Sequence, residues 1–430
     1  MKFIEKLKKD SLGWAFYDWA NSAYATTVLA VFFPLFFNQY WSRGADTSVT
    51  TARLGIANSV VGLILMLTAP VMGTMSDLSF SKKRYLLYST LLGSVFTALL
   101  YTVDPGNWFI ALLFFGISSF GFSAGMIFYD SLLKSVAGHD ELNFLSALGY
   151  SLGYLGGGLL LAFNIMLTLS PEYFGLSSQD QAIRFSFLTV AVWWIVFSLP
   201  LFKYVGEERS EEKMIGMREL LKRTSDQIIK TFRHISKIKE VYLFLLAYWL
   251  YIDGVDTIIR MAMDFGLSIG FEHSSLITAL LITQFVGFPA ALATGILFKG
   301  KNGAKHGIFT AIFIYFAVSI FGAFMRTEAH FYALAVTVGL VQGGIQSLSR
   351  SYFAYIIPEK REGEFFGFFN MIGKFAVILG PLFIALTGLI LREIGFSADI
   401  ASRGGIMSVT FFFLTGGFVF FFSTRVSKEN

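Results

Sequence analysis

The chain carries an unusual stretch at residues 251–264, Tyr251-Ile-Asp-Gly-Val-Asp-Thr-Ile-Ile-Arg-Met-Ala-Met-Asp264, inside an apolar run that begins near Val241. Four charged residues interrupt this run at spacings of three, four and four, and they are Asp253, Asp256, Arg260 and Asp264. On a helix these spacings place the charges on one face, with Thr257 beside them. A charge in the middle of a bilayer costs several kcal/mol. We therefore expect the stripe to face protein or a water-filled cavity in a membrane protein.

The composition points to the same class of protein. Of 430 residues, 55% are hydrophobic and only 15% are charged, which leaves too little polar surface for a soluble domain. The absence of cysteine excludes disulfides, cysteine-based zinc sites and thiol catalysis. The five histidines show no metal-ligand spacing, and no Ser-His-Asp or paired-carboxylate arrangement indicates catalysis. We expect no enzyme activity, no cofactor and no bound metal.

Twelve runs are long enough to cross a membrane, which takes about 20 apolar residues. They cover 12–37, 54–76, 85–103, 108–133, 143–168, 184–205, 241–264, 274–298, 307–325, 331–356, 366–391 and 403–424. This pattern predicts an all-α polytopic membrane protein. Of the 34 Lys and Arg residues, 25 lie in the loops and termini of one side and six on the other. Because basic residues stay on the cytoplasmic side, we expect both termini in the cytoplasm, with the chain in the cell inner (plasma) membrane.

The longest loop divides the twelve runs into six and six. We therefore predict an N-terminal six-helix bundle over 1–205, a cytoplasmic amphipathic linker over 206–240 and a C-terminal six-helix bundle over 241–430. The linker is expected to lie on the anionic inner leaflet, with a regulatory docking site as the alternative. The two halves also carry similar spacings: Asp18, Asn21 and Ser22 match Asp253, Asp256 and Thr257 in type and interval. We interpret this as a duplicated six-helix unit.

The polar residues within the apolar runs are concentrated in the first and fourth run of each half. The candidate substrate or cavity residues are Asp18, Asn21, Ser22, Asp253, Asp256, Thr257, Arg260, Gln342 and Gln346. Asp253 has no basic residue four positions away on its own helix, so it is the first candidate for proton coupling, with Asp18 second. The alternative for Asp256, Arg260 and Asp264 is a set of structural ion pairs.

Other polar residues lie in or near the cytoplasmic ends of the runs. The candidate cytoplasmic gate consists of Asp77, Asp130, Arg350 and Lys374, with acids in one half and bases in the other. For Asp130 and Arg350 the alternative is a side chain that extends to the membrane surface. A glycine-rich run contains Gly149, Gly153, Gly156 and Gly157, but no strand precedes it and no Gly-Lys-Ser/Thr follows. We interpret it as a site of close helix packing.

The loop after the second run, Gly73-Thr-Met-Ser-Asp77-Leu-Ser-Phe-Ser-Lys82-Lys83-Arg84, resembles the loop motif of the major facilitator superfamily. It lacks the basic residue after the acid, and in the second half Lys299 replaces the acid. Five longer blocks are similar to the autophagy-related vacuolar effluxer-like family and its bacterial members, the unknown major facilitator family. They begin at Gly13, Gly149, Asp253, Gly343 and Gly373, and the last includes Gly380-Pro381. The resemblance implies the major facilitator fold of two six-helix halves, packing roles for Gly380 and Pro381, and amino-acid efflux as a first guess.

These features predict a secondary active transporter that works by alternating access. The expected substrate is a small polar metabolite such as an amino acid, with proton coupling as a further hypothesis. Membrane lipids are expected partners, nucleic acid is not, and we expect a monomer. Two alternatives stay open: a lipid or lysolipid transporter or flippase, which the 49 phenylalanines would suit, and a non-transporting receptor or scaffold.

Overall fold

The computed structural model describes residues 8–79, 81–207, 217–235, 238–268, 271–375 and 379–426. Within these ranges, some side chains lie outside the description, at 47–48, 217–218, 221, 232–235, 260–265, 267–268, 273, 375 and 398. The described secondary structure is entirely helical. Twelve helical stretches among these residues are long and apolar enough to cross a membrane, the first starting at Lys9 and the last ending at Val426. The prediction of an all-α protein with twelve transmembrane helices is confirmed.

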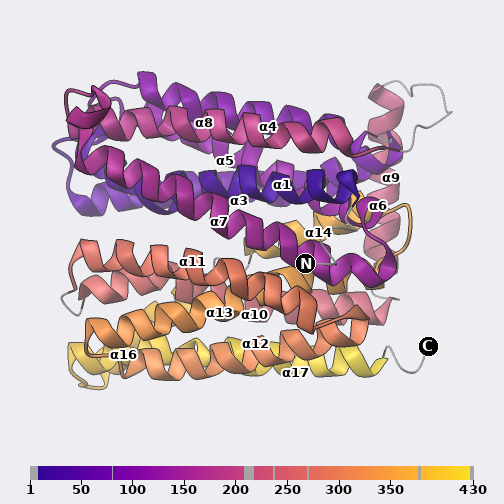
Figure 1. The fold of residues 1–430 in the computed structure, drawn as a ribbon. Coiled ribbons are helices and arrows are strands. Elements are labelled where there is room, and N and C mark those ends of the chain that lie inside the picture. The colour runs from indigo at the N-terminus through magenta and orange to yellow at the C-terminus, as the bar shows by residue number, and fades with distance from the viewer. Residues whose placement is uncertain are drawn as a thin grey trace. The chain divides into compact units, whose positions relative to one another are not determined.

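The α-helices follow one another in the order shown in Figure 1. They are α1 (Lys9–Ala23), α2 (Phe33–Phe36), α3 (Thr47–Leu78), α4 (Lys82–Leu99), α5 (Trp108–Ser131), α6 (Leu133–Val136), α7 (Leu142–Leu169), α8 (Gln179–Tyr204), α9 (Met217–Ile235), α10 (Lys239–Ser268), α11 (His273–Leu297), α12 (Gly300–Ala323), α13 (Glu328–Ile356), α14 (Glu362–Phe375), α15 (Leu379–Glu393), α16 (Ala398–Ser408) and α17 (Thr410–Val426). Wider π-helical turns, η2 (Tyr24–Phe32) and η3 (Phe37–Trp41), continue the first membrane-spanning stretch. Short 3-10 turns are η4 (Leu100–Thr102), η5 (His139–Glu141) and η6 (Pro171–Phe174).

Many large apolar side chains of these helices are exposed. Leu67 on α3, Phe313 on α12 and Phe418 on α17 each have about two thirds of their surface uncovered, at 65%, 70% and 66%. Exposing apolar surface to water costs about 25 cal/mol per Å². Side chains as exposed as these are therefore favourable only where the surrounding medium is itself apolar. This distribution fits helices that are surrounded by lipid.

The chain divides into two compact units. Unit 1 consists of Met1–Gly138, Leu152–Thr224 and Lys360–Gly367, and unit 2 of His139–Ser151, Ser225–Glu359 and Phe368–Asn430. Each unit therefore contains one short segment from the sequence half that supplies most of the other unit. Helix α9 lies within the range for which the amphipathic linker is expected, and its Leu220 and Thr224 are buried.

Unit 1 is held together where small residues let helices approach closely. Helices α4, α5 and α8 lie side by side in Figure 1, and α4 contacts both of the others. At the contact, a Cβ on Gly121 would come 2.6 Å from the main-chain nitrogen of Gly93, and the ring of Trp194 covers Gly93. Any larger residue at these glycines would separate the helices. Close packing at glycine is the main way in which helices associate in lipid, where apolar burial gives little net attraction.

Unit 2 uses the same principle in the packing of α10 against α17. A Cβ on Gly254 would meet the ring of Phe413 at 2.8 Å, and one on Gly416 would meet the main chain of Tyr251 at 2.9 Å. This contact fixes the rotation of α10 about its own axis. The face of α10 that carries Asp253 is thereby set relative to the other helices of the unit.

Candidate functional site

The polar stripe of α10 is partly buried within unit 2. Asp253 is fully buried, Thr257 is buried beside it, and Asp256 is half-buried. The side chains of Arg260 and Asp264 lie outside the described residues, so the proposed ion pairs of the stripe are not described either. The structure thus buries Asp253 completely, and this is the acid that the sequence singles out for its lack of a basic neighbour.

The carboxylate of Asp253 is bound by neutral donors. Its Oδ1 accepts a hydrogen bond from the main-chain N–H of Gly380 at 3.0 Å and one from the Thr257 hydroxyl at 3.3 Å. Its Oδ2 is buried and has no hydrogen-bond partner among the described residues. A buried carboxylate with an unsatisfied oxygen carries a desolvation cost of about 1–3 kcal/mol or more. Because no positive charge stands among these donors, a proton on Oδ2 would neutralise the group without breaking either hydrogen bond.

Gly380 is required for this geometry. A Cβ at position 380 would overlap the Thr257 hydroxyl and would come 2.9 Å from Asp253 Oδ1. The family resemblance implies a packing role for Gly380, and it gives no sign that the N–H of Gly380 binds a carboxylate 127 residues away. Pro381 follows it in the first turn of α15, where proline is tolerated.

The first copy of the repeated element, on α1, has a different set of partners. The Tyr129 hydroxyl of α5 donates a hydrogen bond to Asp18 Oδ2 at 2.8 Å, and the Asn21 amide donates to the sulfur of Met126 at 3.2 Å. Both Asp18 and Asn21 are buried. Tyr129 was not among the candidate residues, because a tyrosine next to Asp130 in an apolar run carries no distinctive signal in one sequence.

The glycines of α7 lie against α1 within unit 1. A Cβ on Gly153 would meet the Ser22 hydroxyl at 2.5 Å, one on Gly156 would meet the main chain of Trp19 at 2.7 Å, and Gly157 is similarly close to Thr26. Gly149, one helical turn earlier, belongs to the segment that is grouped with unit 2. Each acid of the repeat therefore lies on a helix that packs against glycine of a later helix. The later helix is α7 for Asp18 and α15 for Asp253.

Helix α13 brings a buried cation into unit 2. Arg350 is almost completely buried, and its guanidinium donates hydrogen bonds to the hydroxyl and the carbonyl oxygen of Ser146, both at 2.9 Å. It also lies over the ring of Tyr150, 4.4 Å from the centroid. Gln342 and Gln346 on the same helix are half-buried. Asp130 is buried at the end of α5, and Lys374 is half-buried near the end of α14.

The end of α3 forms a latch on the first turn of α14, within unit 1. Asp77 accepts hydrogen bonds from the main-chain N–H groups of Gly363 at 2.9 Å and Glu364 at 2.8 Å. These N–H groups belong to the start of α14, where they have no partner within the helix and carry the positive end of its dipole. Lys82 forms ion pairs at 3.1 Å with both Asp77 and Glu362. Asp77 thus acts as an N-terminal cap supplied by another helix.

In unit 2 the residues between α11 and α12 correspond to the loop after α3 in the repeat, and there the side chain is the donor and the main chain is the acceptor. Here the side-chain amide of Asn143 donates to the carbonyl oxygens of Phe298 at 2.7 Å and Gly300 at 2.8 Å. Lys299, which stands where the first copy has an acid, lies between these two residues in the chain. The departure seen in the sequence is therefore accompanied by a neutral contact, which sequence reasoning did not predict because Asn143 lies far from this loop in the chain.

No group of three or more histidine, cysteine or acidic side chains that would hold a metal ion occurs among the residues that the structure describes. Asp18 and Asp253 are each bound by a hydroxyl or a main-chain donor.

Comparison with known proteins agrees with this architecture. The model of a family described as "Vacuole effluxer Atg22 like" matches residues 6–424. An uncharacterized MFS-type transporter, YxiO of Bacillus subtilis, is 36% identical over 387 residues, which cover 89% of each chain. Autophagy-related protein 22 of Saccharomyces cerevisiae is 22% identical, covering 89% of this chain and 87% of its own. Among solved structures, the human organic anion transporter MFSD10 superposes with a TM-score of 0.71 at 13% identity, covering 96% of this chain and 99% of its own. At that identity the likeness concerns the fold, and it confirms the major facilitator architecture.

Proposed function

This chain belongs to the Atg22-like vacuole effluxer family and is a multi-pass transporter of the major facilitator type, and from that premise we propose that it couples proton movement to transport of a small polar metabolite. It is not an enzyme. An amino acid is the first substrate to test, because the sequence resemblance implies amino-acid efflux and the matching family is described as a vacuole effluxer. The proposed mechanism is alternating access by two six-helix halves in the inner membrane, with both termini in the cytoplasm.

The observation that supports proton coupling is the environment of Asp253. The carboxylate is fully buried, its two donors are neutral, and its Oδ2 has no partner among the described residues. The protonated acid therefore fits the site with its hydrogen bonds to Gly380 and Thr257 intact. A group that can hold its position in both protonation states is suited to carry a proton through a transport cycle. Asp18 is the second candidate, and it differs in having a tyrosine hydroxyl on Oδ2.

An anionic or zwitterionic substrate is supported by the cations within the apolar spans. MFSD10 is described as an organic anion transporter, which is said of that protein alone. In this chain Arg350 is held by Ser146, and Arg260 on the stripe of α10 is proposed as the residue that selects a carboxylate. Arg260→Gln is expected to raise the KM for an amino acid more than it lowers the maximal rate.

The test uses purified protein in proteoliposomes that contain a pH-sensitive dye. Individual L-amino acids are added, and substrate-evoked proton movement is measured together with exchange of the same radiolabelled amino acid. We expect Asp253→Asn, which imitates the protonated acid, to abolish proton movement and to retain exchange. The matched control is Asp399→Asn, which changes an exposed carboxylate paired with Arg403. Unchanged proton movement in Asp253→Asn would exclude this residue as the coupling group.

A further inference from the structure

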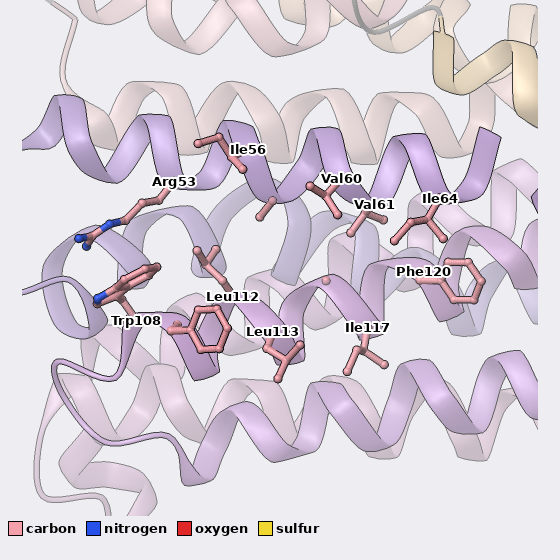
Figure 2. A pocket seen from close by; sticks show the side chains of 13 residues that line it. Arg53, Ile56, Val60, Val61, Ile64, Trp108, Leu112, Leu113, Ile117 and Phe120 are labelled. Carbon is pink, nitrogen blue, oxygen red and sulfur yellow. The ribbon is translucent and has the colours of Figure 1, made fainter. Parts of the chain in front are cut away.

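A groove lies on unit 1 between α3 and α5, and none of the carboxylates discussed above lines it. It has a volume of about 560 Å³, and Figure 2 shows its two walls, with Val60 and Ile64 on one helix and Leu113 and Ile117 on the other. Gly116 also lines it. The groove is therefore a long channel that runs along two membrane-spanning helices.

The lining of this groove is almost entirely apolar and uncovered. Ile56 is 64% exposed, Val60 is 50% exposed and Leu113 is 49% exposed. A continuous apolar channel of this kind requires an apolar occupant, because water in it would leave the surface of all these side chains unfavourably hydrated. The occupant must also be narrow, since the channel is only as wide as the space between two neighbouring helices.

One end of the groove is different. Arg53 is the single charged residue among the described residues that line it, and its guanidinium lies over the ring of Trp108 at 3.9 Å from the centroid. The structure records no hydrogen bond or ion pair from Arg53 to any other described residue, so its donors are directed to whatever lies at this end. Tryptophan and arginine together are typical of the membrane–water interface, where a ring lies at headgroup level and a cation meets phosphate.

The dimensions identify the apolar part of the occupant. Arg53 and Ile64 are eleven residues apart on one helix, which corresponds to about 16 Å at 1.5 Å per residue. Half of the hydrocarbon core of a bilayer is about 15 Å thick. The groove therefore has the length of one acyl chain of one leaflet, with the cation at the headgroup end.

We propose that this groove is a binding site for one anionic phospholipid of the surrounding bilayer, with an acyl chain between α3 and α5 and its phosphate on Arg53. The lipid would pack against both helices and would fix their separation within unit 1. This site is independent of the proton coupling proposed at Asp253. An anionic headgroup is favoured over a zwitterionic one because no described acidic residue lines the groove to balance the charge of Arg53.

The experiment uses the full chain in nanodiscs, with Trp108 as the reporter. Phosphatidylglycerol with brominated acyl chains is titrated into nanodiscs of phosphatidylcholine, and the quenching of tryptophan fluorescence is measured for wild type and for Trp108→Phe, whose difference isolates Trp108. We expect Trp108 to be quenched by brominated phosphatidylglycerol at lower mole fraction than by brominated phosphatidylcholine. Arg53→Gln is expected to weaken the preference for phosphatidylglycerol about fivefold, the effect of one cation near an anionic headgroup.

Two further variants separate the headgroup from the chain. Arg53→Lys keeps the charge and should keep most of the preference, whereas Ala57→Phe fills the groove and should remove the quenching of Trp108 by either lipid. The matched controls are Arg392→Gln, a basic residue at the end of α15, and Leu199→Phe, an exposed apolar residue on α8. The proposal is wrong if Trp108 is quenched equally by both lipids in wild type, or if Ala57→Phe and Leu199→Phe have the same effect.

Discussion

The latch between α3 and α14 leads to a quantitative prediction for Asp77→Asn. In the wild type one carboxylate accepts two main-chain hydrogen bonds from the start of α14 and forms an ion pair with Lys82. The amide of asparagine keeps one oxygen acceptor and turns an N–H donor toward a main-chain N–H. Hydrogen bonds to a charged group contribute about 1.5–3 kcal/mol, whereas those between neutral groups contribute about 0.5–1.5 kcal/mol. Losing one bond and weakening the other should destabilise the latched state by about 2 kcal/mol, which raises the ratio of open to latched molecules about 30-fold.

The assay follows the accessibility of a residue beneath the latch. Ser76 is fully buried, and a Cβ on Gly363 would come 2.5 Å from its hydroxyl, so a cysteine at position 76 is covered by the start of α14. The natural chain has no cysteine, which makes Ser76→Cys a single label without further changes. We expect the alkylation rate of this cysteine by a maleimide to rise about 30-fold when Asp77→Asn is added, because labelling requires local opening.

Two controls decide whether the reasoning holds. Ala111→Cys reports on a fully buried site on another helix, α5, and should keep its labelling rate, which excludes global unfolding. Glu362→Gln removes the ion pairs with Lys82 and Lys134 but leaves both main-chain hydrogen bonds of Asp77 in place, so it should raise the labelling of Ser76→Cys by less than Asp77→Asn does. A change of less than threefold in Asp77→Asn, or an equal change at Ala111→Cys, would refute the assignment of Asp77 as the main latch.

Three other variants test contacts of the described structure. Gly380→Ala should lower the unfolding temperature, since overpacking costs about 1–3 kcal/mol, and adding Thr257→Ala should recover part of the loss; strictly additive losses would contradict the contact. Asn143→Asp should destabilise the protein more than Asn143→Ala, because a carboxylate would face two carbonyl oxygens, and equal unfolding temperatures would count against the neutral contact. Burial raises the pKa of Glu207, which accepts the main-chain N–H of Lys83, so its contribution to stability is present in acid and is lost as the pH rises through the raised pKa. Glu207→Gln should therefore flatten the fall in unfolding temperature as the pH rises above the ordinary pKa of a glutamate, and parallel curves would refute this.

The sequence by itself determined the class of protein, the number of membrane spans and the residues that are out of place in lipid. These are local properties: a span is a run of apolar residues, and helical spacing places Asp253 and Thr257 on one face whatever the rest of the chain does. The cost of a charge in lipid then predicts that such residues are covered by protein, and Asp18, Asp253 and Arg350 are indeed buried. Repeated spacings in the two halves, together with the family resemblance, indicated the major facilitator fold.

Only the tertiary structure decided which groups these residues contact. Asp253 binds an N–H 127 positions away, Asp18 binds a hydroxyl 111 positions away, and Asp77 caps a helix start 286 positions away. Such partners depend on where glycines allow two helices to approach and on how each helix is rotated, and neither is encoded in a short window of sequence. The two main-chain partners leave no trace in residue type, because every residue except proline carries an N–H. The charges that must be accommodated are thus set by the sequence, and the donors that accommodate them are set by the packing of the helices.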